Sequence, residues 1–449
     1  MDETLRKQID AWTETDEHGR IVDMLGQISP EERDSEATGL LARAYNNLGE
    51  YEKALELLDS IEEEEAGDTN WNFRKGYALY FLDRYKEALA CFKKADELTP
   101  EDEDTIEFIR SCNSHLPFRK RVKDFWKWFT DNEEELSRIV ENRGQVDGGD
   151  AVEFVTAGTN LIDEDVHFNL GGDYEFTFSV EGNTHLFYLY PYIVSQMPAQ
   201  FKDKWHFFPF NQGTDASFSF GMYGANVDMA QVQVSAAYQE DINAFNIHFY
   251  EEQLCSLEEA QSYNAYYIMM EIMLGEGLSY QYIASADAPL ENMIKLPELR
   301  AYITDTLKAH GKEIFDNPQQ VYTSYRFEPQ ENEELRFDVM AGSSCFQPLV
   351  ANYYNGSTEL FDRLKAVFIA FPYENKEEGD GKKVLDFRYE LEDRLAAELL
   401  EPEGLGLLLG GAIGTGTCYI DLLLFDESAF MEKIVPSQIS LLSFRLPSG

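Results

Sequence analysis

Apolar residues recur at helical spacing through the amino-terminal part of the chain. Segments 51–58 and 85–92 carry the same pattern, in which a tyrosine is followed by alanine and leucine on one helix face, and they begin 34 residues apart. Apolar side chains at this spacing lie on one side of a helix, and a repeat of this length is typical of stacked helical hairpins. The pattern therefore predicts an array of paired helices.

The two units of the repeat agree position by position. The second contains Gly76, Leu79, Tyr85, Ala88, Phe92 and Ala95 and stops at Pro100, and the first has Ala42, Tyr45, Tyr51, Ala54, Leu58 and Ile61 at the matching places. This spacing resembles the tetratricopeptide repeat family over about residues 1–116. A degenerate unit at 21–28 is expected to cap the array, and a helix over 105–116 to close it, because such a unit cannot bury its apolar face alone.

The resemblance implies a groove, lined by the first helix of each unit, that holds a peptide or helix of a protein partner. The candidate partner-binding residues are the inward polar positions Arg43, Asn46, Asn47, Arg74, Tyr77 and Tyr80. Of these, Arg43, Asn46 and Arg74 are the candidates for grasping a carboxyl terminus, as one variant of the family does. The alternative is that the groove packs against the rest of the same chain.

Past residue 117 the helical spacing gives way to alternation of apolar and polar residues. Segment 174–180 alternates as a half-buried strand does, and 185–190 is expected to return beside it as a second strand after a turn. Further expected elements are strands over 232–238 and 244–250 and helices over 257–274 and 296–310. Together they predict an α+β domain over 117–315 with an antiparallel sheet covered on one side.

The carboxyl-terminal part, 316–449, alternates again. Expected strands cover 321–327, 335–340, 366–373, 404–409, 417–425 and 438–444, and expected helices cover 384–400 and 427–434. From 366 onward the order is strand, helix, hairpin, helix, strand, which is the ferredoxin-like order. The chain is thus expected to be multidomain, with α repeats at 1–116 and α+β domains at 117–315 and 316–449.

Two segments of this last part carry a family resemblance. The acidic helix at 389–395 and the glycine-rich hairpin at 410–421 resemble bacterial ferredoxin-like proteins related to the regulator of ribonuclease activity B family. The resemblance implies a cytosolic binding or regulatory module and brings no catalytic motif with it. The glycines are expected to form a bulged hairpin, since a phosphate loop needs a following helix and a nearby lysine.

Charge narrows the classes of partner. The chain has 83 acidic against 37 basic residues, a net charge of −46 and a pI near 4.4. This charge repels phosphate backbones and anionic lipids, so neither nucleic acid nor a membrane surface is an expected partner. The densest basic run, 118–123, is expected either to neutralise the neighbouring acidic repeats or to form an anion- or partner-binding surface.

Candidate chemistry is sparse. The five cysteines lie far apart, which argues against disulfides and a zinc ribbon, and the seven histidines show no metal-binding spacing. No catalytic residue, metal or cofactor is therefore expected. No secretory leader or membrane-spanning apolar window is evident, so the expected location is the cytoplasm.

Three functions stay open from these observations. The first is a non-enzymatic adaptor or scaffold that binds a protein partner through the repeat groove. The second is an acidic regulator or inhibitor of a basic enzyme such as a nuclease, as an immunity protein would be. The third is a hydrolase whose site lies between the two α+β domains, and the oligomeric state is not predicted.

Overall fold

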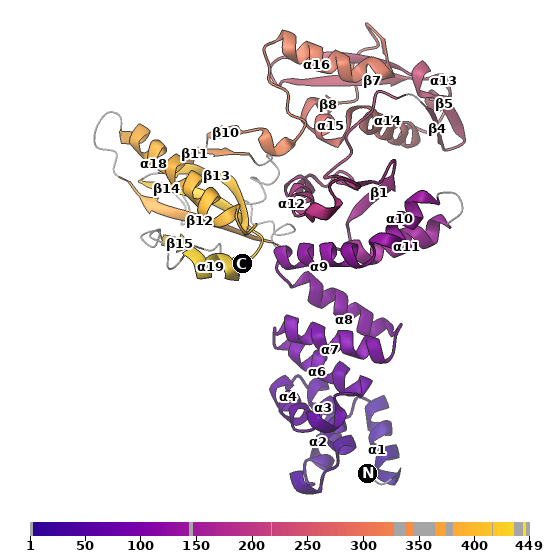
Figure 1. Cartoon of the computed structure of the whole chain (residues 1–449), viewed down its shortest axis with the longest axis vertical. Coiled ribbons are helices and arrows are strands. Elements are labelled where there is room, and N and C mark those ends of the chain that lie inside the picture. Colours follow the sequence, from indigo (N-terminus) through magenta and orange to yellow (C-terminus); the bar gives the residue numbers. More distant parts are fainter. Residues whose placement is uncertain are drawn as a thin grey trace. The chain divides into compact units, whose positions relative to one another are not determined.

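The computed structural model describes residues 3–142, 147–216, 218–326, 338–344, 364–373, 380–414, 416–434 and 443–445 (Figure 1). The chain forms two compact units, Met1–Asp124 with Thr159–Glu164 and Phe125–Gly158 with Asp165–Gly449. The boundary between the units falls within helix α9 (Phe118–Asp131).

Helical hairpins make up the first unit. Its helices are α1 (Glu3–Glu14), α2 (His18–Leu25), α3 (Ser35–Asn47), α4 (Tyr51–Asp59), α5 (Glu62–Glu65), α6 (Thr69–Phe81), α7 (Tyr85–Leu98) and α8 (Glu103–Ser114), with a 3-10 turn η1 (Pro30–Glu32). The longer helices pack against their neighbours in sequence order, from α1 to α8 (Figure 1). The helical amino-terminal region predicted from the repeat is confirmed.

Three aspartates start the repeated helices. The side chains of Asp34, Asp68 and Asp102 accept hydrogen bonds from the backbone N–H groups three residues later, at 2.8, 2.8 and 2.9 Å. Each aspartate satisfies a donor that the first turn of α3, α6 or α8 would otherwise leave unpaired. The three caps are spaced at the 34-residue interval of the repeat, so the same local signal sets where each unit begins.

The repeat core depends on one close approach. Phe92 of α7 is fully buried, and its ring atoms lie 3.0 Å from where a Cβ at Gly76 of α6 would stand. The same ring stacks on Phe108 of α8 with centroids 4.9 Å apart. Glycine at position 76 therefore allows α6 and α7 to pack tightly, and α8 closes the apolar face as the sequence predicts.

Basic residues at the start of α9 form hydrogen bonds and ion pairs within the first unit. Arg121 is only 2% exposed, its Nη1 donates to the carbonyl of Ile162 at 2.7 Å, and it lies 3.6 Å from Asp163. Lys120 pairs with Asp124. These side chains thus bind backbone and acidic groups of the same unit.

The second unit begins with aromatic-rich elements. They are α9, α10 (Glu133–Glu141), α11 (Gly148–Thr159), the strands β1 (His167–Gly171), β2 (Glu175–Ser179) and β3 (His206–Phe208), and the turns and helix η2 (Thr184–Tyr188), α12 (Tyr190–Ser195) and η3 (Ala199–Phe201). The sheet order is β1-β2-β3, antiparallel between β1 and β2 and parallel between β2 and β3.

One expected strand is wrong. Residues 185–190 form η2 and the start of α12, and β3 takes the place beside β2. Two local signals favour the helical turn: the Asn183 side chain accepts from the N–H of His185 at 3.3 Å, and Pro191 stands in the first turn of α12. A short apolar run that is buried on all sides does not distinguish helix from strand by its spacing.

A second layered region follows. It contains the hairpin β4 (Ser219–Met222) and β5 (Ala225–Asp228), the strands β6 (Gln233–Gln239), β7 (Ala244–Tyr250), β8 (Ile283–Ser285) and β9 (Ile294–Lys295), the helices α13 (Glu252–Cys255), α14 (Glu259–Leu274), α15 (Glu276–Tyr282) and α16 (Leu299–Ala309), and the turns η4 (Met229–Gln231), η5 (Leu296–Glu298) and η6 (Pro318–Gln320). The four-stranded sheet has the order β8-β7-β6-β9. The expected β6–β7 pair is antiparallel, whereas β7 and β8 run parallel, so the sheet is mixed.

The last sheet has six strands in the order β10-β11-β13-β14-β12-β15, and every pair is antiparallel. Its elements are β10 (Thr323–Arg326), β11 (Asp338–Ser343), β12 (Lys365–Pro372), α18 (Asp380–Leu395), the π-helical turn η7 (Ala396–Leu400), β13 (Gly406–Gly414), β14 (Thr417–Leu424), α19 (Glu427–Ile434) and β15 (Ser443–Arg445). Apolar residues of α18, η7 and α19 share one core with β12 and β14. The expected strand segments 335–337 and 438–442 lie outside the described residues.

The glycine-rich segment is a bulged hairpin, as expected. The register between β13 and β14 shifts between Leu408 and Gly410. Gly410 has φ 136°, and a Cβ there would stand 2.1 Å from the carbonyl oxygen of Gly342. Glycine is required at this point, because β11 and β13 approach too closely for a side chain.

Candidate partner-binding groove

A hollow of about 320 Å³ opens between α3 and α6 of the first unit. Its lining consists of Arg43, Asn46, Asn47, Asn70, Phe73, Arg74 and Tyr77. Five of the six residues singled out from the sequence thus lie together at one place. We call this hollow the groove.

Tyr80 is the exception among the six. Its hydroxyl lies 2.7 Å from the Ser111 hydroxyl, and its ring packs edge-on against Phe108 at 5.3 Å. Tyr80 therefore holds α6 to α8 and does not line the groove. Sequence reasoning missed Asn70 and Phe73. Asn70 lies four residues before Arg74 and Phe73 four residues before Tyr77, so a helical projection would have placed each beside a residue of the groove.

Arg74 is the electrostatic centre of the groove. Its side chain is half-buried, and Nη1 lies 3.0 Å from where a Cβ at Gly39 would stand, so the glycine of α3 makes room for it. Burial and the like charge of Arg43 lower the pKa of Arg74 to about 10. The guanidinium stays charged at neutral pH, and among the described residues no carboxylate forms an ion pair with Arg43 or Arg74.

Asn46 joins the two walls of the groove. It is 5% exposed, and its Nδ2 donates to the backbone carbonyl of Arg74 at 2.9 Å. Its Oδ1 is buried and accepts no hydrogen bond from the described residues. A buried acceptor left in this way is costly, and an N–H donor in the groove would relieve it.

Aromatic rings continue the groove surface along α6. Tyr77 packs on Phe81 at 4.7 Å and on Phe73 at 6.4 Å between centroids, and Phe81 stacks on Tyr51 at 4.8 Å while remaining 43% exposed. The groove thus combines two cations and three asparagines with an apolar strip, a combination that can bind both the polar backbone and the side chains of a peptide.

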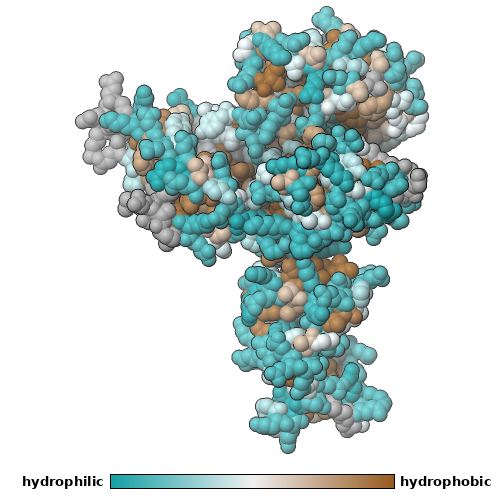
Figure 2. Space-filling view, viewed as in Figure 1, coloured by the Kyte–Doolittle hydropathy of each residue, from teal (hydrophilic) through white to brown (hydrophobic). Residues whose placement is uncertain are grey.

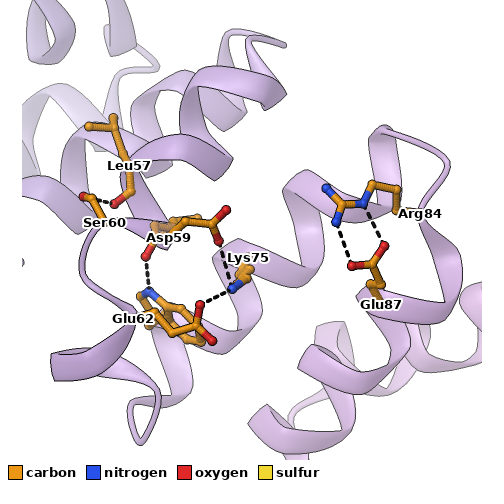
Figure 3. A network of polar contacts seen from close by, with 9 residues as sticks. Leu57, Asp59, Ser60, Glu62, Lys75, Arg84 and Glu87 are labelled. Carbon is orange, nitrogen blue, oxygen red and sulfur yellow. Dashed lines mark hydrogen bonds and ion pairs between the residues drawn. The ribbon is translucent and has the colours of Figure 1, made fainter.

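Other cations of the first unit differ from Arg43 and Arg74. In Figure 3, Lys75 lies between Asp59 and Glu62, at 2.9 and 3.0 Å. Arg84 makes two bonds to Glu87, at 2.8 and 2.6 Å. Lys75 and Arg84 thus have carboxylate partners, whereas the described residues provide none for the groove arginines.

The comparison with protein families agrees with the helical pattern. The tetratricopeptide repeat model matches residues 72–102, which include most of α6 and all of α7. Repeats of this kind generally bind protein partners, so the match indicates a role in protein–protein interaction. No curated protein matches the chain.

Neither a membrane-spanning helix nor a cluster of metal ligands occurs among the described residues. None of their helices has the length and apolar character needed to cross a membrane, and no three of their His, Cys, Asp or Glu side chains converge as metal ligands. On the face drawn in Figure 2, hydrophilic residues cover most of the surface and apolar ones form scattered patches.

Proposed function

We propose that this protein is an adaptor that binds a partner polypeptide in the groove, with Arg43 and Arg74 holding a carboxylate of that partner. The observation that carries the proposal is the presence of two adjacent arginines without a carboxylate partner among the described residues, in a chain of net charge −46. The carboxylate is a chain terminus or an acidic side chain.

The geometry supports recognition by hydrogen bonds. Guanidinium groups bind carboxylates through paired, charge-assisted bonds, each of which contributes roughly 1.5–3 kcal/mol. Asn46 lines the groove and its buried Oδ1 has no hydrogen-bond partner among the described residues, and Asn47 and Asn70 are exposed on either wall. Tyr77 and Phe73 provide an apolar surface for the preceding side chain.

The test uses a library of peptides with free carboxyl termini, selected on the full-length protein. Selected peptides should lose at least tenfold in affinity when their carboxyl terminus is amidated, or when an acidic side chain is changed to its amide. The double charge reversal Arg43→Glu with Arg74→Glu should abolish binding in fluorescence anisotropy.

The matched control is Lys53→Glu with Arg84→Glu. This variant has the same change in net charge, but both residues are exposed and paired with Glu50 and Glu87 outside the groove. Equal loss of binding in the two double variants would attribute the effect to overall charge and contradict the proposal.

We further propose that the carboxyl-terminal region is ferredoxin-like and resembles the regulator of ribonuclease activity B family. The order β12, α18, β13, β14, α19, β15, with the sheet order β13-β14-β12-β15, supports it. Separate apolar cores within 42–116, 220–307 and 367–434 support the domain boundaries near 116 and 315. The described cysteines, Cys91, Cys112, Cys255 and Cys418, are free thiols, which supports a cytoplasmic location.

A second candidate function is an acidic inhibitor of a basic enzyme. The net charge of −46 favours it. Association by such a surface would be steered by charge and would weaken steeply as salt is raised from about 0.05 to 0.5 M. Binding that survives R43E/R74E but collapses with salt would favour this candidate over the adaptor.

A further inference from the structure

A cavity of about 360 Å³ lies in the second unit, at the low end of the usual size range of ligand pockets. Helices α14 and α15 supply eight of its eighteen lining residues, and strands β7 and β8, the turn η2 and the loop before η2 supply most of the others. This cavity belongs to a different unit from the groove and shares no residue with it.

Two pairs of packed aromatic rings form part of the lining. Phe187 of η2 packs on Tyr280 of α15 with centroids 5.5 Å apart, and Phe249 of β7 stacks on Tyr266 of α14 at 5.2 Å. Tyr267 also lines the cavity and remains 46% exposed. These rings present electron-rich faces that attract cations and apolar groups alike.

Two glutamates line the cavity, and one of them is already occupied by the protein. Glu276 is 1% exposed. Its Oε1 accepts from the Ser179 hydroxyl at 2.7 Å and from the N–H groups of Val180 and Glu181 at 2.9 and 3.3 Å, and its Oε2 accepts from the N–H of Asn211 at 2.8 Å. Glu276 therefore joins α15 to the end of β2 and the loop at 211.

Glu271 has no such set of donors. Its described hydrogen-bond partner is the hydroxyl of Tyr267, and burial together with the charges of Glu276 and Glu181 raises its pKa to about 7. It also lines a neighbouring hollow of about 650 Å³ with Glu175 and Glu181. As far as the structure describes them, the linings of both hollows contain no lysine or arginine.

We propose that the cavity binds a small organic cation, an alkyl- or arylalkyl-ammonium, with its charged nitrogen at the Glu271 carboxylate and its apolar part among the rings of Phe187, Phe249, Tyr266 and Tyr280. A partly buried carboxylate without a counter-charge gains most from a cationic ligand. The aromatic lining selects an organic cation over a hydrated metal ion, which prefers a shell of oxygen ligands.

The test is a charge series of equal size, measured by isothermal calorimetry on the full-length protein at pH 8. The probes are phenethylammonium, the neutral 2-phenylethanol and the anionic phenylacetate. We expect phenethylammonium to bind at least tenfold more tightly than the alcohol, and phenylacetate not to bind. Equal binding of cation and alcohol would overturn the proposal, as would tighter binding of Mg²⁺ or Ca²⁺ that displaces the amine.

Two variants place the ligand in this cavity. Glu271→Gln should remove the preference for the cation over the alcohol, whereas Glu240→Gln, an exposed change in the β6–β7 turn of the same unit, should leave it intact. Ala284→Phe adds bulk at an exposed lining position and should weaken all binding at least tenfold. Undiminished amine binding in both E271Q and A284F contradicts the site, and R43E/R74E should leave amine binding unchanged because that variant tests the groove alone.

Discussion

Each of the two units contains one charged side chain that the protein itself pairs and one that it leaves without an oppositely charged partner among the described residues. Arg121 in the first unit and Glu276 in the second are almost fully buried, and the chain supplies their partners at hydrogen-bond distance. Arg74 and Glu271 are less deeply buried, yet each faces a hollow and a like-charged neighbour, Arg43 for the first and Glu276 for the second.

The difference shows what a buried charge means. Burial alone shifts the pKa of a charged side chain and costs solvation free energy. Internal hydrogen-bond donors or acceptors offset that cost, and the charged side chain then stabilises the fold. A charge that is desolvated without internal compensation is the better sign of a binding site. Arg74 and Glu271 satisfy this second description, with opposite sign in separate units.

The largest expected effect is the loss of stability when Glu276, whose carboxylate is paired within the protein, is removed. Glu276→Ala removes four accepted hydrogen bonds and leaves backbone donors of Val180, Glu181 and Asn211 without an acceptor. We expect a loss of about 3–5 kcal/mol in the unfolding free energy of the second unit. Urea unfolding gives the loss, and hydrogen exchange should quicken at the three amides.

Glu271→Ala is the control for that measurement. It deletes a carboxylate of the same type in the same cavity that has one described hydrogen-bond partner, so its cost should be well below half that of E276A. If both variants lose equal stability, the distinction between a structural and a binding carboxylate fails.

The arginines provide the same contrast in the first unit. Arg121→Leu deletes the donor to the carbonyl of Ile162 and the charge beside Asp163, and should cost about 3 kcal/mol. Arg74→Leu removes a charge without an ion-pair partner among the described residues, so stability should change by no more than about 0.5 kcal/mol. Thermal unfolding followed by circular dichroism compares the two, and a larger loss for R74L would make Arg74 structural.

The pH dependence of stability sharpens the comparison further. The folded protein raises the pKa of Glu271 from 4.5 to about 7, so the native state binds this proton more tightly than the unfolded chain does. The resulting stability is fully present below pH 4.5 and is lost as the pH rises through 7.

Glu271→Gln should therefore be more stable than the wild type at pH 8, by on the order of 1 kcal/mol once solvent screening is allowed for. At pH 4 the two proteins should unfold at the same point. Melting curves from pH 4 to pH 8 test this difference. A gap that stays constant over this range would mean that Glu271 does not titrate as described.

Sequence predicted the first unit better than the second for a physical reason. Contacts such as Phe92 against Gly76 join adjacent helices of one repeat. The 34-residue pattern therefore predicts them. The caps at Asp34, Asp68 and Asp102 share that period and were a readable signal that was missed. The bonds of Glu276 join residues 65 to 97 positions apart, and no local pattern marks such pairs.

The groove shows where periodicity stops being enough. Helical spacing correctly grouped Arg43, Asn46, Asn47, Arg74 and Tyr77, because these residues share the inward faces of α3 and α6. It also included Tyr80, since spacing alone does not show which neighbouring helix a side chain contacts. Tyr80 on α6 forms a hydrogen bond with the Ser111 hydroxyl on α8, and this contact depends on how α8 packs against α6.

Tyr80→Phe tests this last distinction with the smallest effect. Loss of the bond to Ser111 should cost roughly 0.5–1 kcal/mol of unfolding free energy, while affinity for a groove peptide should stay within twofold of the wild type. Tyr77→Ala should instead weaken the peptide by at least fivefold, because its ring lines the groove. Anisotropy titrations with one selected peptide compare the two variants. Weaker binding by Y80F would mean that Tyr80 contacts the peptide after all. Unchanged binding by Y77A would mean that the aromatic residues of α6 do not contact the peptide.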